Sequence, residues 1–213
     1  MSWPRRQQPS LKLAGALIVG IMLLASPRCS PAWAQAPVLE IKAASDLPVW
    51  KTVTIGQHRG VDELRNALSE AHIAIGETAD EVLGRAAFTY SRERREVDLV
   101  VVSVAQLGFR SEGATLGDIH ARALALGLEL CTEEVGPQLR LQYLNQPIGQ
   151  SLHIGMKGQR TYRGSHIDFT LHNSGVGLAL LGGSADPELG IAANVLFVFV
   201  RPSSYQVILT AEE

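Results

Sequence analysis

An apolar run spans residues 97–104, which read VDLVVVSV. Most of its members are valines, which favour the pleated sheet because β-branched side chains are stiff at χ1. A nearly continuous apolar run of about eight residues is typical of a strand covered on both faces, with a buried helical segment as the alternative. We therefore predict a central strand in which Val100, Val101 and Val102 are all buried.

A helix is predicted directly after this strand. Thr115 precedes Asp118 by three residues, which resembles a capping box. Apolar residues then follow at helical spacing, namely Leu116, Ile119, Ala123 and Leu126. Gly127 is well placed to end the helix. We expect this helix to cover one face of the central strand.

The remaining pattern predicts further strands and helices. Leu139, Leu141 and Tyr143 alternate with polar residues, which predicts a half-buried strand after a turn at Gly136 and Pro137. Strands are also expected near residues 50–55, 151–156, 166–172, 177–181, 195–200 and 205–210. Helices are expected at residues 61–71 and, after a second capping-box pattern at Thr78 and Glu81, at residues 78–83.

These elements predict one α+β domain, in which two or three helices pack on a mainly antiparallel β-sheet. The domain would span residues 50–213, with residues 37–49 as a lead segment. Its length is sufficient for a hydrophobic core without disulfide bonds.

Residues 1–36 have the pattern of a cleaved secretory signal peptide. Basic residues precede an apolar run at residues 13–25, whose 13 residues are fewer than the roughly 20 that a membrane-spanning helix needs. Small residues then allow cleavage after Ala34 or Ala36, and Pro37 makes Ala34 the favoured site. An uncleaved anchor is the alternative. A periplasmic or secreted protein is therefore expected, with membrane contact only during export.

Removal of the signal changes the charge. The signal carries four basic residues and no acidic ones, so 15 Lys and Arg remain against 21 Asp and Glu, a net charge of −6. An acidic domain lacks the positive surface that phosphate backbones require, so no nucleic-acid partner is expected. The cluster SRERRE at residues 91–96 has two interpretations, a docking patch or a solvated loop before the central strand.

Few residues suggest chemistry. No known catalytic, nucleotide-binding or CXXC motif occurs, and no cofactor is expected. Cys131 would be the only cysteine of the mature chain, and its place at the end of LGLELC predicts a buried, inert thiol rather than a nucleophile. Glu133 and Glu134 are an adjacent acid pair, for which a solvated turn is expected rather than an acid–base role.

One polar sheet face contains possible metal ligands. If the hairpin between the strands at 151–156 and 166–172 is centred near Arg160, His153 comes opposite His166, with Asp168 beside them. Imidazole and carboxylate groups suit zinc or similar ions. The alternative is an exposed polar face that holds these residues without a ligand.

Several segments together resemble a domain family of small bacterial proteins with no known activity. They are GVDELRNAL, VDLVVVSVAQLGF, the helix ending in LGLELC, EVGPQLRLQY with QPIG after it, and FVFVRP. The resemblance covers residues 50–154 and 195–202, while residues 151–194 match poorly. It implies no cofactor or catalytic residue, and the signal peptide departs from many relatives.

The sequence thus favours an exported, non-catalytic binding or interaction domain whose partner is a protein, a glycan or a small molecule. The alternative is a small exported metal-dependent enzyme that uses His153, His166 and Asp168. A third and weaker hypothesis is a thiol-dependent activity at Cys131.

Overall fold

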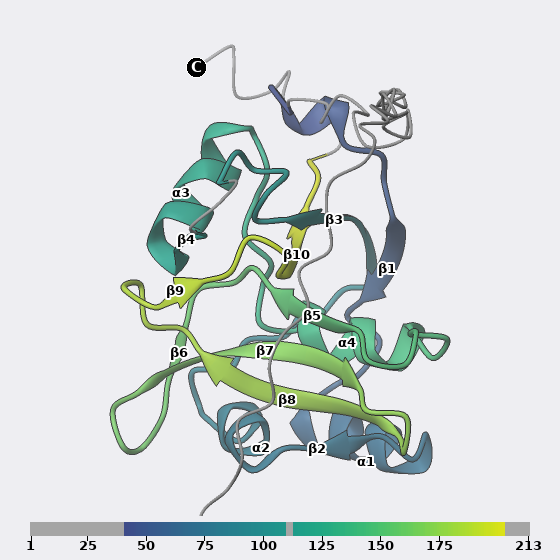
Figure 1. The fold of residues 1–213 in the computed structure, drawn as a ribbon. Helices are drawn as coiled ribbons and strands as arrows, with labels where there is room; N and C mark the ends of the chain where they lie inside the picture. Colours follow the sequence, from purple (N-terminus) through teal and green to yellow (C-terminus); the bar gives the residue numbers. More distant parts are fainter. Residues whose placement is uncertain (1–40, 110–112, 203–213) are drawn as a thin grey trace, which may run out of the picture. The chain divides into compact units, whose positions relative to one another are not determined.

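The computed structural model describes residues 41–109 and 113–202 (Figure 1). The helices are α1 (Val61–Glu70), α2 (Glu77–Leu83), α3 (Leu116–Ala125) and α4 (Val135–Gln142), and a 3₁₀ turn forms η2 (Ala44–Asp46). The strands are β1 (Lys51–Ile55), β2 (Ala74–Ile75), β3 (Arg95–Ser103), β4 (Ala114–Thr115), β5 (Ser151–Ile154), β6 (Gln159–Arg160), β7 (His166–Asn173), β8 (Leu178–Ser184), β9 (Gly190–Ile191) and β10 (Leu196–Val200). The predicted signal peptide and the predicted strand at 205–210 lie outside the described residues.

Most strands form one sheet in the order β1-β3-β10-β5-β7-β8-β2, with β6 paired to β7. Adjacent strands are antiparallel except for β10 with β5 and β2 with β8, which run parallel. A separate sheet joins β4 and β9. The α+β prediction is confirmed, but the sheet is mixed and the described part contains four α-helices instead of two or three.

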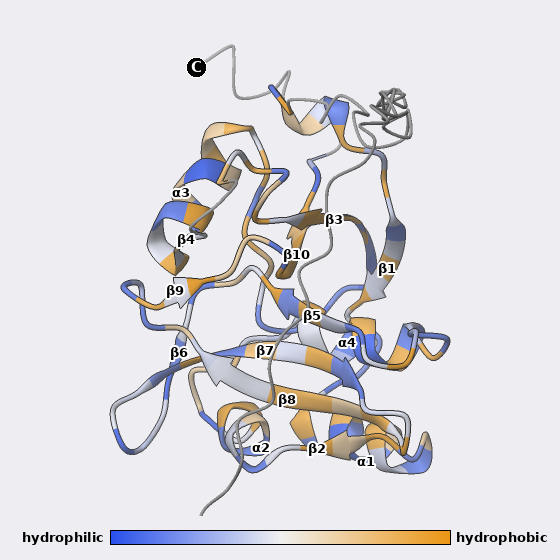
Figure 2. Ribbon diagram, viewed as in Figure 1, coloured by the Kyte–Doolittle hydropathy of each residue, from blue (hydrophilic) through white to orange (hydrophobic). Residues whose placement is uncertain are grey.

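Each face of the sheet carries its own hydrophobic core. Helices α1, α2 and α4 contribute to one core through Leu64, Leu68, Val82, Leu83, Val135 and Leu139. Helix α3 contributes to the other core, where Ile119 and Ala123 pack with Val100, Val102, Phe197 and Phe199. Apolar residues accordingly dominate β3 and β10 in Figure 2. Both faces of the central strands are therefore covered, as the valine run predicts.

The central strand is β3, between β1 and β10. Val100 and Val102 are fully buried under α3, whose Leu126 joins the same core. Val101 points to the opposite face and is only half-buried, because it lies at the margin of the core beneath α1 and α4. The prediction that all three valines are buried is thus wrong for Val101.

Helix α3 begins and ends where the sequence predicts. The hydroxyl of Thr115 accepts a hydrogen bond from the Asp118 backbone N–H at 3.2 Å, and it donates to the Asp118 carboxylate at 2.8 Å. Gly127 follows the helix with a φ of +83°, a conformation that glycine adopts without steric cost.

Helix α4 replaces the strand predicted at residues 139–143. Residues 135–140 are all buried, so no polar face marks the helical period and the alternation of leucines is misleading. Pro137 lies in the first turn, where its missing N–H breaks no helical bond. Gly136 packs on Phe169, whose ring leaves no room for a Cβ atom.

Helix α2 begins one residue earlier than its predicted cap. Gly76 precedes the helix and Thr78 lies inside it. The Thr78 hydroxyl instead approaches the carbonyl oxygen of Gly182 in β8 at 3.4 Å. The capping-box prediction at Thr78 is therefore wrong, although the short helix itself is confirmed.

Candidate functional site

A groove opens where strand β3 continues past the end of strand β10. The ladder pairs Val200 with Leu99, and the backbone N–H of Arg201 then donates to the carbonyl oxygen of Asp98 at 2.8 Å. Strand β10 ends at Val200, and the same register places Pro202 opposite Val97, whose backbone groups point toward β1. Within the described part, residues 95–97 therefore have β1 as their only strand neighbour.

Glu96 turns its backbone N–H and C=O toward this groove. On the other side of β3 it faces Thr54. The Thr54 N–H donates to Gln142 Oε1 at 3.0 Å, and the Thr54 C=O accepts from Gln142 Nε2 at 2.8 Å, so both groups point away from β3. Residues that face each other without bonding in an antiparallel ladder direct their N–H and C=O groups outward. Glu96 thus presents both groups on the groove side.

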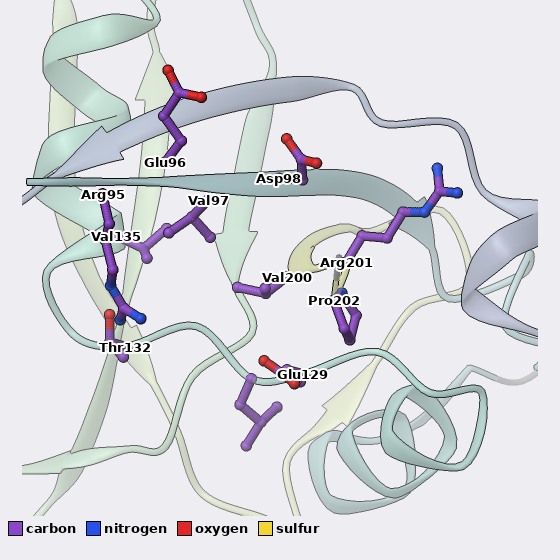
Figure 3. A pocket seen from close by; sticks show the side chains of 11 residues that line it. Arg95, Glu96, Val97, Asp98, Glu129, Thr132, Val135, Val200, Arg201 and Pro202 are labelled. Atoms are coloured by element: carbon purple, nitrogen blue, oxygen red, sulfur yellow. The ribbon is translucent and has the colours of Figure 1, made fainter. Parts of the chain in front are cut away.

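The groove has an apolar centre. Figure 3 shows Val97, Val135 and Val200 pointing into it from β3, α4 and β10. All three valines belong to the core to which α1, α2 and α4 contribute, so the floor of the groove is an extension of that core. A ligand in the groove would therefore bury apolar surface that the fold leaves accessible.

Charged side chains line the ends of the groove. In Figure 3, Arg95 lies beside Thr132 at one end, while Glu129 lies toward the end formed by Arg201 and Pro202. Arg95 and Glu129 are both exposed. Arg95 thus brings a positive charge to the first end, while Glu129 and Arg201 bring one charge of each sign to the second.

The groove has a volume of about 450 Å³. Ligand sites in proteins typically measure roughly 300–1,000 Å³ and combine apolar walls with a few polar groups. The four residues 95–98 span about 13 Å as a strand. The groove can therefore hold a small ligand or a few residues of an extended chain.

The predicted metal ligands share one face of the sheet but are spread along it. The ladder places His153 opposite Thr170 and His166 opposite Arg160. The predicted register is wrong because β6 adds its own pairing to β7 and moves the turn to residues 161–165. Across residues 41–109 and 113–202, no three His, Cys, Asp or Glu side chains lie close enough to hold a metal ion.

Two histidines of this face bind hydroxyl groups instead. The Nδ1 atom of His153 lies 3.3 Å from Thr170 Oγ1, and that of His172 lies 2.8 Å from Ser151 Oγ. Burial lowers the pKa of His153, which favours the neutral imidazole.

Asp168 is the unusual residue of this face. Its side chain is buried, and Oδ1 has no hydrogen-bond partner among the described residues. Burial raises the pKa of Asp168 to about 7, against the opposing effect of the nearby backbone N–H groups of Asp168 and Gly183. Gly183 leaves the necessary space, since a Cβ atom there would lie 2.5 Å from Oδ1.

The Cys131 thiol is buried, as predicted. Its Sγ lies 3.5 Å from the carbonyl oxygen of Val198, and burial raises its pKa to about 12. Nucleophilic cysteines are accessible and have a lowered pKa. The geometry therefore gives no support to a thiol-dependent activity.

Glu134 is buried, which corrects the predicted solvated turn. Its carboxylate accepts hydrogen bonds from the backbone N–H groups of Gly56 and Ser91, both at 2.7 Å. Gln138 donates a third bond at 3.2 Å. Glu134 therefore ties the start of α4 to the chain after β1 and to the segment before β3, both next to the groove.

Arg140 is a second buried charged residue that the sequence pattern does not reveal. Its guanidinium donates to the Gln146 side chain and to the carbonyl oxygen of Tyr143. Burial lowers its pKa to about 10, so it stays charged at neutral pH. Gln146 also donates to the carbonyl oxygens of Gln150 and Leu171, at 3.1 and 3.2 Å. These bonds fix the loop after α4 against β7.

The sequence contains two signals for the groove. Arg201 and Pro202 directly follow the apolar run of β10, and the charged cluster at 91–96 supplies Arg95 and Glu96 at the start of β3. The pairing that places them side by side is a long-range feature, so the sequence pattern alone does not predict it.

Comparisons with protein-family models, with curated proteins and with solved structures find no significant match to this chain. The resemblance to a small bacterial domain family therefore stays a prediction. None of the described helices combines the length and apolar character that a membrane crossing requires.

Proposed function

We propose that the protein is an exported, non-catalytic binding or interaction domain that holds its ligand in the groove beside β3. The observation that carries this proposal is the groove of about 450 Å³, in which Val97, Val135 and Val200 form an apolar centre between charged side chains. Concave sites of this size that combine apolar walls with a few polar groups are typical of ligand binding.

The lining limits the class of ligand. Val97, Val135 and Val200 favour an apolar portion, while Arg95 and Glu129 favour polar or charged groups at its ends. A protein segment, a glycan and a small molecule all meet this description. The net charge of −6 after removal of the predicted signal disfavours nucleic acid.

The metal-dependent enzyme has less support. It requires His153, His166 and Asp168 to converge, and the register of β7 against β5 and β6 separates them along the sheet. We therefore place the function in the groove.

Ligand screening by thermal shift tests the proposal, with protein purified after expression of the full chain. The screen contains short peptides, oligosaccharides and small polar metabolites. Thr132 is exposed and lines the groove, so Thr132→Trp fills the groove without disturbing the core. Ser69→Trp places the same side chain on the exposed surface of α1 as a matched control.

We expect at least one class of compound to raise the melting temperature of the parent and of Ser69→Trp, but not of Thr132→Trp. The proposal is wrong if no class has this effect, or if every stabilising compound stabilises Thr132→Trp equally.

Export is tested separately. Mass spectrometry of the periplasmic or culture fraction should find a mature chain that begins at Gln35 or Pro37. An intact Met1 in a soluble cytoplasmic pool would contradict export.

A further inference from the structure

We propose that a second pocket of the protein binds one sugar ring through its hydroxyl groups. The pocket lies between the turn that joins β6 to β7 and the loop that follows β8, and its volume is about 310 Å³. Its lining consists of Gly164, Ser165, His166, Ser184, Asp186 and Pro187, all within the described part of the chain. None of these residues lines the groove beside β3, so the two proposals concern separate sites.

One wall of the pocket is formed by the β6–β7 turn and the start of β7. The Thr161 N–H donates to the carbonyl oxygen of Ser165 at 2.8 Å, and the Gly164 N–H donates to that of Thr161 at 3.0 Å. Gly164 has a φ of +89°, which glycine adopts without steric cost. These bonds fix the positions of Ser165 and His166 before any ligand binds.

The opposite wall is the loop at residues 185–189. The Ala185 N–H donates to the carbonyl oxygen of His166 at 2.8 Å, which joins the two walls. The N–H of Gly117, at the start of α3, donates to the carbonyl oxygen of Pro187 at 2.9 Å and holds the loop from its other side. Both walls are therefore pre-organised, which lowers the entropic cost of binding a ligand.

Hydrogen-bonding side chains dominate the lining. Ser165 and Ser184 have hydroxyl groups that donate and accept, and His166 has two ring nitrogens. The Asp186 carboxylate accepts the Glu188 backbone N–H at Oδ1, at 3.0 Å, while its Oδ2 makes no hydrogen bond to the described residues. Neighbouring hydroxyl groups of a sugar also donate and accept, so a sugar ring can satisfy this mixture of groups.

Other classes of ligand match this lining less well. Pro187 is the one lining residue with an apolar side chain, so an apolar ligand would bury little apolar surface. Among residues 41–109 and 113–202, no third His, Cys, Asp or Glu joins His166 and Asp186 to hold a metal ion. A Cβ atom on Gly164 would lie 3.7 Å from Nη2 of Arg160, whose positive charge therefore offsets that of Asp186. A neutral ligand with many hydroxyl groups suits both charges.

The probes are glucose, galactose, mannose and N-acetylglucosamine, each titrated into the full-chain protein. Nuclear magnetic resonance of the backbone amides reports the response of each residue separately. We expect at least one sugar to shift the His166, Ser184 and Asp186 amide signals in a saturable manner and to leave the Val97 signal unchanged. The dissociation constant should be about 2 mM, the affinity that ordinary ligand efficiency gives a ligand of roughly twelve non-hydrogen atoms. If no sugar shifts the pocket signals, the proposal is wrong.

The role of the carboxylate is tested by Asp186→Asn, which keeps an acceptor for the Glu188 N–H but removes the charge. This variant should bind the sugar about tenfold more weakly, because hydrogen bonds to a charged acceptor are the stronger ones. Asp62→Asn makes the same change on the exposed surface of α1 and should bind as the parent does. Equal affinity of Asp186→Asn and the parent would overturn the proposal.

The location of the ligand is tested by Ser165→Trp, which fills the pocket from an exposed position. We expect this variant to lose the sugar-induced shifts at His166 and Ser184, while Ser69→Trp on α1 retains them. Persistence of these shifts in Ser165→Trp would show that the sugar binds elsewhere.

Methylammonium chloride and inorganic phosphate test whether the pocket binds charge alone. We expect neither ion to shift the His166 and Ser184 signals at the concentration at which the sugar saturates them. If either ion binds as tightly as the best sugar, the pocket is an ion site and the sugar assignment is wrong.

Thermal melting distinguishes this pocket from the groove. A sugar bound in the pocket should stabilise Thr132→Trp as much as the parent and should not stabilise Ser165→Trp. A sugar with the reverse pattern binds in the groove, which supports the proposed function and contradicts the present inference.

Discussion

The backbone N–H of Arg201 lies 2.8 Å from the carbonyl oxygen of Asp98, and this bond closes the ladder between β10 and β3 at the mouth of the groove. Within the described residues 41–109 and 113–202, β3 therefore continues past the end of β10, and Glu96 and Val97 face only Thr54 and Val53 of β1 across a ladder.

Residues of β3 differ in burial, so the loss of stability caused by an introduced carboxylate should depend on its position. Val102→Asp places a carboxylate without a partner under α3, which should cost about 3–5 kcal/mol of a total stability of about 5–15 kcal/mol. Val101→Asp should cost less, because Val101 is half-buried and the carboxylate can reach water.

Thermal melting followed by circular dichroism measures both variants, with Val176→Asp as a control at a position that is 99% exposed. Val102→Asp should unfold at the lowest temperature and Val176→Asp should match the parent. Equal melting of Val102→Asp and the parent would show that β3 is not a central strand.

The buried carboxyl group of Asp168 predicts a dependence of stability on pH. Its pKa rises from 3.8 to about 7 on folding, because burial disfavours the charged form. The folded state therefore binds the proton more tightly, and stability is lost as the pH rises from about 4 through about 7. At 1.36 kcal/mol per pKa unit, the loss at pH 8 is about 4 kcal/mol.

Asp168→Asn removes this ionisation, so it should increase the free energy of unfolding relative to the parent at pH 8. The difference should shrink toward zero at pH 4. Urea denaturation at both pH values measures this difference in the free energy of unfolding. For Asp62→Asn, on the exposed surface of α1, the difference from the parent should not grow between pH 4 and pH 8. A difference for Asp168→Asn that is the same at both pH values would contradict the assignment.

The Cys131 thiol should be inert in the folded protein. Its burial and raised pKa of about 12 leave almost no accessible thiolate at neutral pH. Iodoacetamide should modify the native protein far more slowly than the urea-unfolded protein. Cys131→Ser should cost about 1–2 kcal/mol through poorer burial and leave groove binding intact. Rapid alkylation of the native protein would contradict this assignment.

The two adjacent glutamates should differ in their effect on stability. Glu134→Ala removes the acceptor of two backbone N–H groups, those of Gly56 and Ser91, and should cost about 3 kcal/mol. Among the described residues, Glu133 accepts hydrogen bonds from two side chains, the Thr89 hydroxyl and the Gln159 amide, which can turn to water. Glu133→Ala should therefore cost about 1 kcal/mol or less. Chemical denaturation compares them, and equal costs would refute the buried role of Glu134.

Local signals predicted much of the fold. The valine run identified β3, and the Thr115–Asp118 cap with Gly127 identified α3 almost to the residue. Alternation identified β1, β5 and β7. These patterns succeed because each of these strands or helices has a distinct buried face, whose period appears in the sequence.

The remaining features depend on tertiary context. Helix α4 is buried almost all round, so its sequence lacks the contrast that distinguishes a helix from a strand. The sequence pattern did not reveal the short strand β6, which pairs with β7. His166 therefore lies opposite Arg160, and His153 lies opposite Thr170 instead of His166. The groove arises from pairing between residues about 100 positions apart, as in the bond from Arg201 to Asp98.

The melting temperature of the full-chain protein in the presence of short peptides, oligosaccharides and small polar metabolites tests the central claim most directly, because the groove is the proposed binding site. The account predicts that at least one class of compound stabilises the parent and Ser69→Trp but not Thr132→Trp. If every stabilising compound acts equally on Thr132→Trp, the account is contradicted.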